Sequence, residues 1–156
     1  MNMKKILIAV DDSKGTRKAV TTFANVCKCI NPESVVLLYV EQFEGRSLMT
    51  EMLPVSELST LKEVLNGTDY KEALDKKANT IMDYYKDYLV KAQPASQIKT
   101  VIKLGNPAEE ILETAKDEGV DMIIVGSRGK RVSHLFMGSI SREVANLSPV
   151  PVLIAK

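Results

Sequence analysis

Two pairs of small residues near the end of the chain, with basic residues within and just after the first pair, have a spacing that suits phosphate binding. Gly126 and Gly129 stand three apart, so the backbone there can turn sharply and expose its N–H groups. Gly138 and Ser139 then open a predicted helix, whose N-terminus carries free donors and partial positive charge. Three of the side chains in 128–131 are basic. The stretch is therefore a candidate phosphate cradle, although a structural turn without a ligand has the same pattern.

The glycine spacing differs from that of two common nucleotide-binding motifs. The P-loop pattern Gly-x-x-x-x-Gly-Lys-Ser/Thr is absent from the chain. The Gly-x-Gly-x-x-Gly fingerprint belongs to the first strand of a Rossmann unit, whereas these glycines follow the fourth predicted strand and are spaced differently. Any phosphate site here must therefore be of another kind.

The elements that position this stretch are five short apolar runs rich in β-branched residues. Continuous rather than alternating runs are typical of strands buried on both faces, as in a parallel sheet. In an open α/β sheet, ligands bind beyond the carboxyl ends of the strands, where Asp11, Val40 and Gly126 are expected. The runs are residues 4–10, 34–40, 98–104, 122–125 and 150–155.

Helical patterns separate these runs. Residues 16–30 and 69–90 repeat apolar side chains at spacings of three and four. Asn106 can cap a third helix that has Pro107 at its first position. A last helix is predicted over 139–147. Strands alternating with helices predict a doubly wound α/β domain, with a parallel sheet covered by helices on both faces.

Segment 41–68 is the irregular part of this pattern. Its apolar residues predict a short helix, and the remainder reads as a surface loop, which in a compact domain is often functional or mobile. The residues of that predicted helix are Val55, Leu58, Leu61 and Leu65.

Length and charge exclude several classes of protein. The 156 residues carry a formal net charge of +1, too little to bind nucleic acid or anionic lipid without specific contacts. No apolar run approaches the roughly 20 residues that cross a bilayer, and Ile6 to Val10 is too short for the core of a signal peptide. We therefore expect one domain over residues 1–156 that stays in the cytoplasm, without nucleic-acid or membrane partners.

The whole chain resembles the universal stress protein family in several ordered motifs. Ile6–Ser13, in which Asp-x-Ser closes the first strand, is similar to the family's opening. Residues 105–111 resemble its Gly-x-Pro-x-x-x-Ile helix start, 121–129 its fourth strand and glycine turn, and 138–141 with 149–154 its closing helix and strand. The resemblance implies a five-stranded sheet in the order 3-2-1-4-5, so that the ends of strands 1 and 4 flank one crevice.

The glycine motif also resembles that of the family's nucleotide-binding branch, which carries Gly-x2-Gly-x9-Gly-(Ser/Thr). Gly126, Gly129, Gly138 and Ser139 correspond to it, but only eight residues separate Gly129 from Gly138. One residue is worth about 3.3–3.6 Å of chain. We expect the loop to tighten without moving the helix start, and a distorted phosphate pocket is the alternative.

The resemblance implies a role for each matching residue. Asp11 should approach the ribose or an Mg²⁺ ion bound to the phosphates, and Val40 should offer its backbone to the adenine edge. Residues of the glycine motif should surround the phosphates. The residues implied to bind ATP or AMP are Val10, Asp11, Val40, Gly126, Arg128, Gly129, Gly138, Ser139 and Ile140.

The implied function is a stress-response switch or sensor that binds an adenine nucleotide. Phosphoryl transfer needs a positioned base, and the sequence offers no clear candidate. The alternatives are a nucleotide-free protein that works through partners, a slow ATPase, and a small-molecule transferase using the same crevice.

Family members often pair their last strand with that of a second copy. The resemblance therefore implies a homodimer through Val150, Val152 and Ile154, since an apolar edge strand needs cover. The competing interpretation is a monomer whose edge is protected by Pro149 and Pro151.

Overall fold

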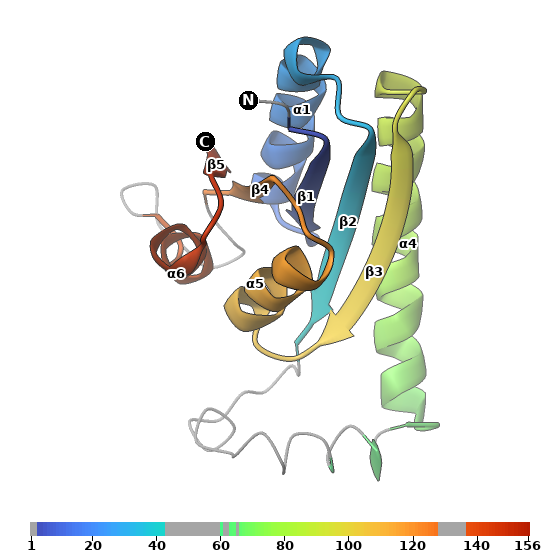
Figure 1. The fold of residues 1–156 in the computed structure, drawn as a ribbon. Coiled ribbons are helices and arrows are strands. Elements are labelled where there is room, and N and C mark those ends of the chain that lie inside the picture. Colours follow the sequence, from blue (N-terminus) through green and yellow to red (C-terminus); the bar gives the residue numbers. More distant parts are fainter. Residues whose placement is uncertain (1–2, 43–59, 61–62, 65, 128–136) are drawn as a thin grey trace.

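The computed structural model describes residues 3–42, 60, 63–64, 66–127 and 137–156, and it alternates strands with helices (Figure 1). The strands form one parallel sheet in the order β3-β2-β1-β4-β5, which confirms the predicted α/β fold and strand order. The four apolar residues that predicted a short helix, Val55, Leu58, Leu61 and Leu65, lie outside the described residues. The elements are β1 (Lys5–Val10), α1 (Lys14–Ile30), β2 (Ser34–Glu41), α4 (Asp69–Ala92), β3 (Gln97–Leu104), α5 (Pro107–Asp117), β4 (Met122–Gly126), α6 (Ser139–Leu147) and β5 (Val152–Ala155).

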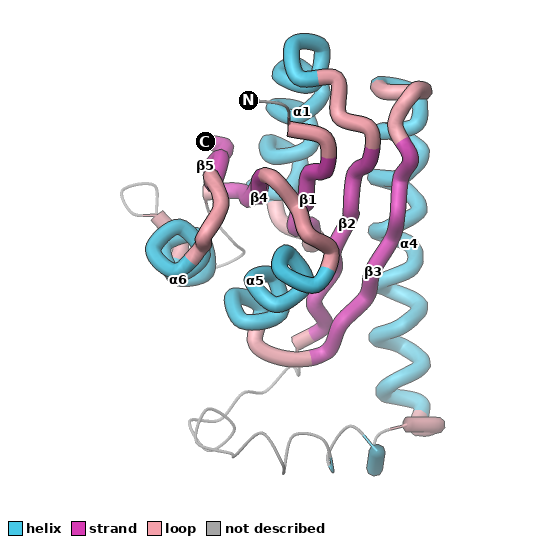
Figure 2. The backbone as a smooth tube through the Cα atoms, in the orientation of Figure 1, coloured by secondary structure: helices cyan, strands magenta, loops and turns pink. Residues whose placement is uncertain are grey.

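Helices cover both faces of the sheet, which explains the unbroken apolar runs in its strands (Figure 2). Ile8 of β1 and Phe23 of α1 belong to the core cluster on the face covered by α1 and α4. Leu7, the next residue along β1, clusters instead with Ile111 of α5 and Val144 of α6. Adjacent side chains of a strand point to opposite faces. A central strand with a core on each side therefore needs apolar side chains at successive positions.

Polar side chains begin three of the helices. Ser13, Thr68 and Asn106 each accept a hydrogen bond from a backbone N–H in the first turn of α1, α4 and α5. Because Ser13 caps α1, that helix begins at Lys14, two residues earlier than its apolar pattern indicates. The residue before α6 is Gly138, which has no side chain to accept such a bond.

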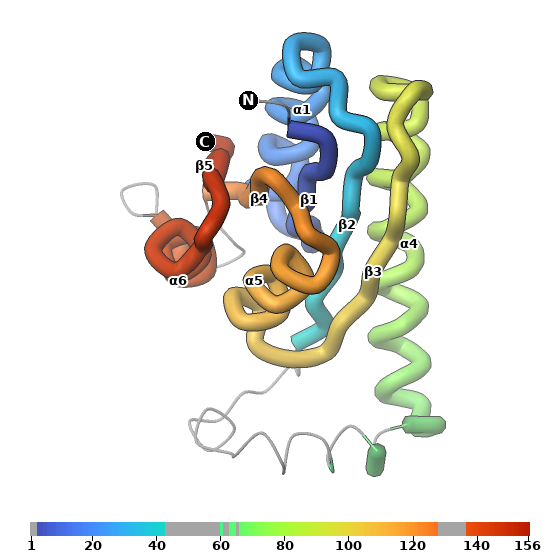
Figure 3. The backbone as a smooth tube through the Cα atoms, in the orientation of Figure 1, coloured from blue at the N-terminus to red at the C-terminus, as the bar shows by residue number. Residues whose placement is uncertain are grey.

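The direction of winding changes beside β1. Figure 3 follows the chain outward from β1 through β2 to β3, and then back through α5 to β4 on the other side of β1. One carboxylate oxygen of Asp121, just before β4, accepts hydrogen bonds from the backbone N–H groups of Lys4 and Lys5 at 2.8 and 2.9 Å. These bonds join β4 to β1 at their amino ends. Their carboxyl ends form the topological switch point, where α/β sheets bind ligands.

The edge strand β5 is short. It begins at Val152, so Val150 and Pro151 precede it rather than belonging to it. β5 pairs with β4 from Ile123↔Val152 to Gly126↔Ala155, and the first three of its side chains are only half-buried. Its outer edge has no strand partner among the described residues.

Candidate functional site

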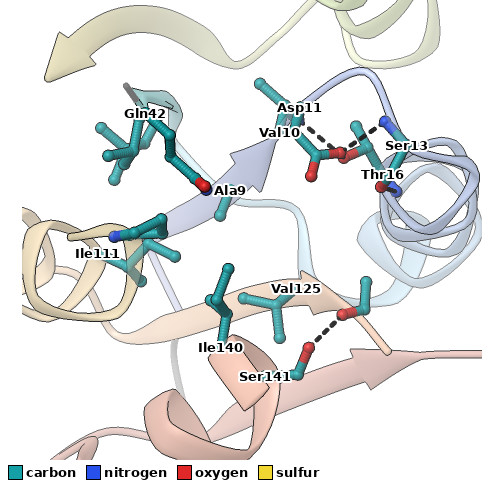
Figure 4. A pocket seen from close by; sticks show the side chains of 14 residues that line it. Ala9, Val10, Asp11, Ser13, Thr16, Gln42, Ile111, Val125, Ile140 and Ser141 are labelled. Carbon is teal, nitrogen blue, oxygen red and sulfur yellow. Dashed lines mark hydrogen bonds between the residues drawn. The ribbon is translucent and has the colours of Figure 1, made fainter. Parts of the chain in front are cut away.

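A cavity lies at the carboxyl ends of β1, β2 and β4, on the side of the sheet covered by α5 and α6 (Figure 4). It holds about 530 Å³ of empty space, part of which is open to solvent. Most of its side chains are apolar, so it offers a slot for a flat or apolar group. The apolar lining residues are Ala9, Val10, Leu38, Val40, Pro107, Ile111, Val125 and Ile140.

Hydrogen bonds fix the turn between β1 and α1 at one end of this cavity. The Asp11 N–H donates to Thr16 Oγ1 at 2.8 Å, and the Thr16 hydroxyl donates back to Asp11 Oδ1 at 2.5 Å. Asp11 Oδ1 also accepts from the Ser13 N–H at 2.8 Å, which closes a local turn. The Asp11 carboxylate is therefore held in one orientation, and its Oδ2 accepts no hydrogen bond from the described residues.

The start of α6 forms another wall. The Ser141 hydroxyl donates to the carbonyl oxygen of Gly126 at 2.6 Å, and the Gly138 N–H donates to the carbonyl of Ser127 at 2.8 Å. These two bonds tie the first turn of α6 to the end of β4. The N–H groups of Ser139, Ile140 and Ser141 have no acceptor among the described residues, as expected for the first turn of a helix.

Gly126 has a structural reason to be glycine. A Cβ atom there would lie 2.5 Å from the carbonyl carbon of Gly15 and 2.6 Å from its oxygen. The absence of a Cβ at Gly126 therefore lets the end of β4 approach the Gly15 backbone in the first turn of α1 closely. Among the described glycines, only Gly67 and Gly119 have positive φ. The conformational freedom expected from the sequence is thus not what Gly126 supplies.

The end of β2 reaches past β1. The last β1–β2 pair is Val10↔Tyr39, so no β1 residue stands opposite Val40. Val40 and Gln42 line the cavity. Glu41, between them, points to the other face and forms an ion pair of 2.8 Å with Lys71 of α4. That ion pair anchors the strand end that carries two cavity residues.

Glu41 is a buried acid with an incomplete set of partners. Its side chain is 1% exposed, and its Oε1 has no hydrogen-bond donor among the described residues. Burial raises the pKa of the Glu41 carboxyl, and the Lys71 ammonium only partly offsets this rise. Burial alone would lower the pKa of Lys71, but the carboxylates of Asp75 and Glu41 raise it. The environment thus keeps Lys71 charged and disfavours the charge on Glu41.

The structure brings five of the nine predicted residues together. Val10, Asp11, Val40, Gly126 and Ile140 line the cavity.

Of the other four predicted residues, two lie outside the described residues and two do not line the cavity. Arg128 and Gly129 lie outside the described residues. Gly138 is buried at the start of α6, and Ser139 is not a lining residue but lies beside Arg142 on the outer face of that helix. The binding role of all nine stays a prediction.

Sequence reasoning missed four polar residues of the cavity: Ser13, Thr16, Gln42 and Ser141. A hydroxyl at a helix start, three residues after a capping serine, was a signal for Thr16. Gln42 follows the second apolar run by two positions and had no motif to mark it. Ser141 lies in the first turn of α6, and its sequence context gives no indication that its hydroxyl reaches the carbonyl of Gly126.

The described residues contain no group of three or more His, Cys, Asp or Glu side chains that could hold a metal ion. Mg²⁺ is commonly bound through one or two carboxylates together with the phosphates of a substrate. Asp11, with Oδ2 available, fits that mode, whereas a metal held by protein ligands alone does not fit the described part of the site.

The family model of the universal stress proteins matches residues 2–156. The chain belongs to the universal stress protein family. The curated universal stress protein MJ0577 of Methanocaldococcus jannaschii is 32% identical over 157 residues, covering 98% of this chain and 94% of that protein. A solved structure of MJ0577 superimposes with a TM-score of 0.78, covering 100% of this chain and 97% of that one.

More distant universal stress proteins share the fold. One solved in complex with cAMP has a TM-score of 0.67 at 17% identity, covering 99% of this chain and 98% of that one. Another, from Archaeoglobus fulgidus in complex with dAMP, has a TM-score of 0.59 at 15% identity, with both chains covered in full. At these identities the likeness establishes the universal stress protein fold.

Replacing Gly126 with alanine should destabilise the protein. The new Cβ atom meets backbone atoms of Gly15, which cannot move aside, so we expect a loss of about 1–3 kcal/mol in the free energy of unfolding. Gly105→Ala is the matched control, because the three atoms nearest to its Cβ belong to the flexible Glu110 side chain rather than to backbone. Urea denaturation of both variants measures the difference, and equal losses would contradict the packing role of Gly126.

Changing the Glu41–Lys71 pair should alter the dependence of stability on pH. A raised pKa means that folded Glu41 keeps its proton when the unfolded chain has lost it, so the stability that it contributes falls as pH rises through that interval. Glu41→Gln removes this loss, and its stability relative to wild type should therefore increase from pH 4 to pH 7.

The stability of Lys71→Met relative to wild type should instead decrease from pH 4 to pH 7. This substitution leaves Glu41 buried without its cation, at a cost of up to about 3–5 kcal/mol at neutral pH. Thermal and urea denaturation across this pH range check both variants, and parallel stability curves for all three proteins would contradict the assignment.

Proposed function

We propose that this protein binds an adenine nucleotide, ATP or AMP, in the cavity between β1 and β4 and acts as a switch or sensor in a stress response. The observation that carries the proposal is the cavity itself, because it joins an apolar slot to an uncapped helix start at the switch point of the sheet. The cAMP and dAMP complexes of distant relatives support this class of ligand.

Each part of a nucleotide has a matching part of the site. The apolar slot suits the base. Val40 has no pairing partner in β1, so its backbone groups can face the edge of the base. The N–H groups at the start of α6 suit the phosphates, with Gly138 and Ser139 at that start. Asp11 Oδ2 suits a ribose hydroxyl or an Mg²⁺ ion that arrives with the phosphates.

The glycine motif completes this proposal. Gly126 and Ile140 line the cavity, and Val10 lies at the end of β1 beside Asp11. We assign Arg128 and Gly129 to the phosphates on the resemblance of the motif alone. A few charge-assisted hydrogen bonds of about 1.5–3 kcal/mol each, together with burial of the base, are enough for micromolar affinity, about −8 kcal/mol.

A binding role fits these residues better than rapid turnover. Asp11 is the one carboxylate that lines the described part of the cavity, and its Oδ1 is already engaged by Ser13 and Thr16. A carboxylate held in that way is suited to orienting a ligand. Slow ATP hydrolysis is the second candidate, because Oδ2 remains free to hold a water molecule.

We place this activity in the cytoplasm, as the sequence indicates. No helix in the described ranges has the length and apolar character needed to span a membrane.

The first experiment identifies the ligand. Purified protein is denatured, any released nucleotide is identified, and the nucleotide-free protein is titrated with ATP, ADP and AMP in the presence of Mg²⁺. We expect an adenine nucleotide and an increase in the melting temperature on adding it. Ala9→Phe, which fills the slot, should weaken binding at least tenfold, whereas Val90→Phe on the exposed surface of α4 should not. Protein that neither carries nor binds a nucleotide would favour the partner-binding alternative.

We also propose that two copies associate through β5. The outer edge of this strand has no partner among the described residues, and Val152 and Ile154 are only half-buried in a single chain. A twofold pairing of the two β5 strands would satisfy both the backbone edge and these side chains. Val150, just before the strand, would lie at the margin of the interface.

Val152→Lys should disrupt this homodimer, because it places a charge beside the strand edge that pairs. Light scattering should show a mass of 17.2 kDa for the variant and twice that mass for the wild type. Val90→Lys, on exposed α4, is the control and should leave the mass unchanged. A dimeric Val152→Lys protein with intact circular dichroism would rule out this interface.

A further inference from the structure

Gln42 is the polar side chain of the cavity that the fold leaves uncommitted. Thr16 and Asp11 bond to each other, Ser13 caps α1, and Ser141 donates to a carbonyl. The Gln42 amide makes no hydrogen bond within the described structure. Figure 4 shows its side chain extending from the end of β2 toward the cavity that it helps to line.

The strand end that carries Gln42 is fixed. The carbonyl of Glu41 accepts a hydrogen bond from the Gly105 N–H at 3.2 Å, and its side chain is anchored to Lys71 on the opposite face of the sheet. Gln42 follows at the next position and so points to the cavity face. An anchored backbone limits the positions that the amide can reach, as a specific contact requires.

We propose that Gln42 is a specificity residue, which reads the N6/N7 edge of adenine with its side-chain amide. This inference rests on the proposed nucleotide binding. The amide carbonyl accepts a hydrogen bond from the 6-amino group while the amide NH₂ donates to N7, which is the pairing that glutamine makes with adenine. The 6-amino group has two hydrogens, so the backbone carbonyl of Val40 can accept a hydrogen bond from the second one.

The same amide discriminates against guanine. Guanine has a carbonyl oxygen in place of the 6-amino group, so its O6 and N7 are both acceptors. The Gln42 carbonyl would then face an acceptor, and rotating the amide would move this mismatch to N7. At most one of the two hydrogen bonds forms. A site that pairs with a substrate group rejects analogues that lack it, because its own polar group is left without a partner.

The test compares wild type with Gln42→Leu, using ATP, 7-deaza-ATP and GTP in calorimetric titrations. The analogue 7-deaza-ATP lacks the acceptor at N7 and keeps the 6-amino group. Wild type should bind ATP about tenfold more tightly than 7-deaza-ATP, and more tightly still than GTP. Gln42→Leu should bind ATP more weakly and should bind ATP and 7-deaza-ATP equally. Gln97→Leu, exposed at the amino end of β3, is the control and should behave as wild type.

The outcomes separate this inference from the proposed function. If wild type binds ATP and Gln42→Leu keeps the preference for ATP over 7-deaza-ATP, the role of Gln42 is overturned. Nucleotide binding itself then still stands. Wild type that binds none of the three nucleotides would overturn both. If Gln42 only stabilised the fold, Gln42→Leu would weaken the binding of all three nucleotides by the same factor. The result that supports the inference is therefore loss of the preference for ATP over 7-deaza-ATP.

Discussion

The close approach of Gly126 to Gly15 is the constraint on which the candidate site depends. It places the end of β4 directly against the first turn of α1, without side chains between them. The carbonyl of Gly126 is then in position to accept the Ser141 hydroxyl, and this bond holds the start of α6 over the cavity. Two helix starts thus meet at one strand end because Gly126 has no Cβ atom.

Several parts of the fold could be predicted because they follow from local chemistry. Unbroken apolar runs identified the strands, and Asn106 with Pro107 marked the start of α5. The position of α6 followed from Gly138 and the proline after it. Such signals depend on neighbours in the sequence, and the strand order was supplied by the resemblance to the family.

The rest could not be predicted, because it depends on residues far apart in the chain. Glu41 directly follows an apolar run, as a solvated strand end would, yet it is buried against Lys71, 30 residues later. The packing role of Gly126 depends on Gly15, which lies far earlier in the chain, in the first turn of α1. Gln42 gains its candidate role only from the cavity, which residues of three strands and three helices line.

The ion pair between Glu41 and Lys71 has a consequence for the variability of this chain. It fastens the end of β2 to the beginning of α4, so the two ends of the intervening stretch are held at fixed, neighbouring points. The entropic cost of bringing together the two ends of a connection grows by only about 0.6 kcal/mol for each doubling of its length. Insertions and deletions between these anchors should therefore be tolerated, and descendants of this sequence can diversify there while the ligand-facing wall stays in place.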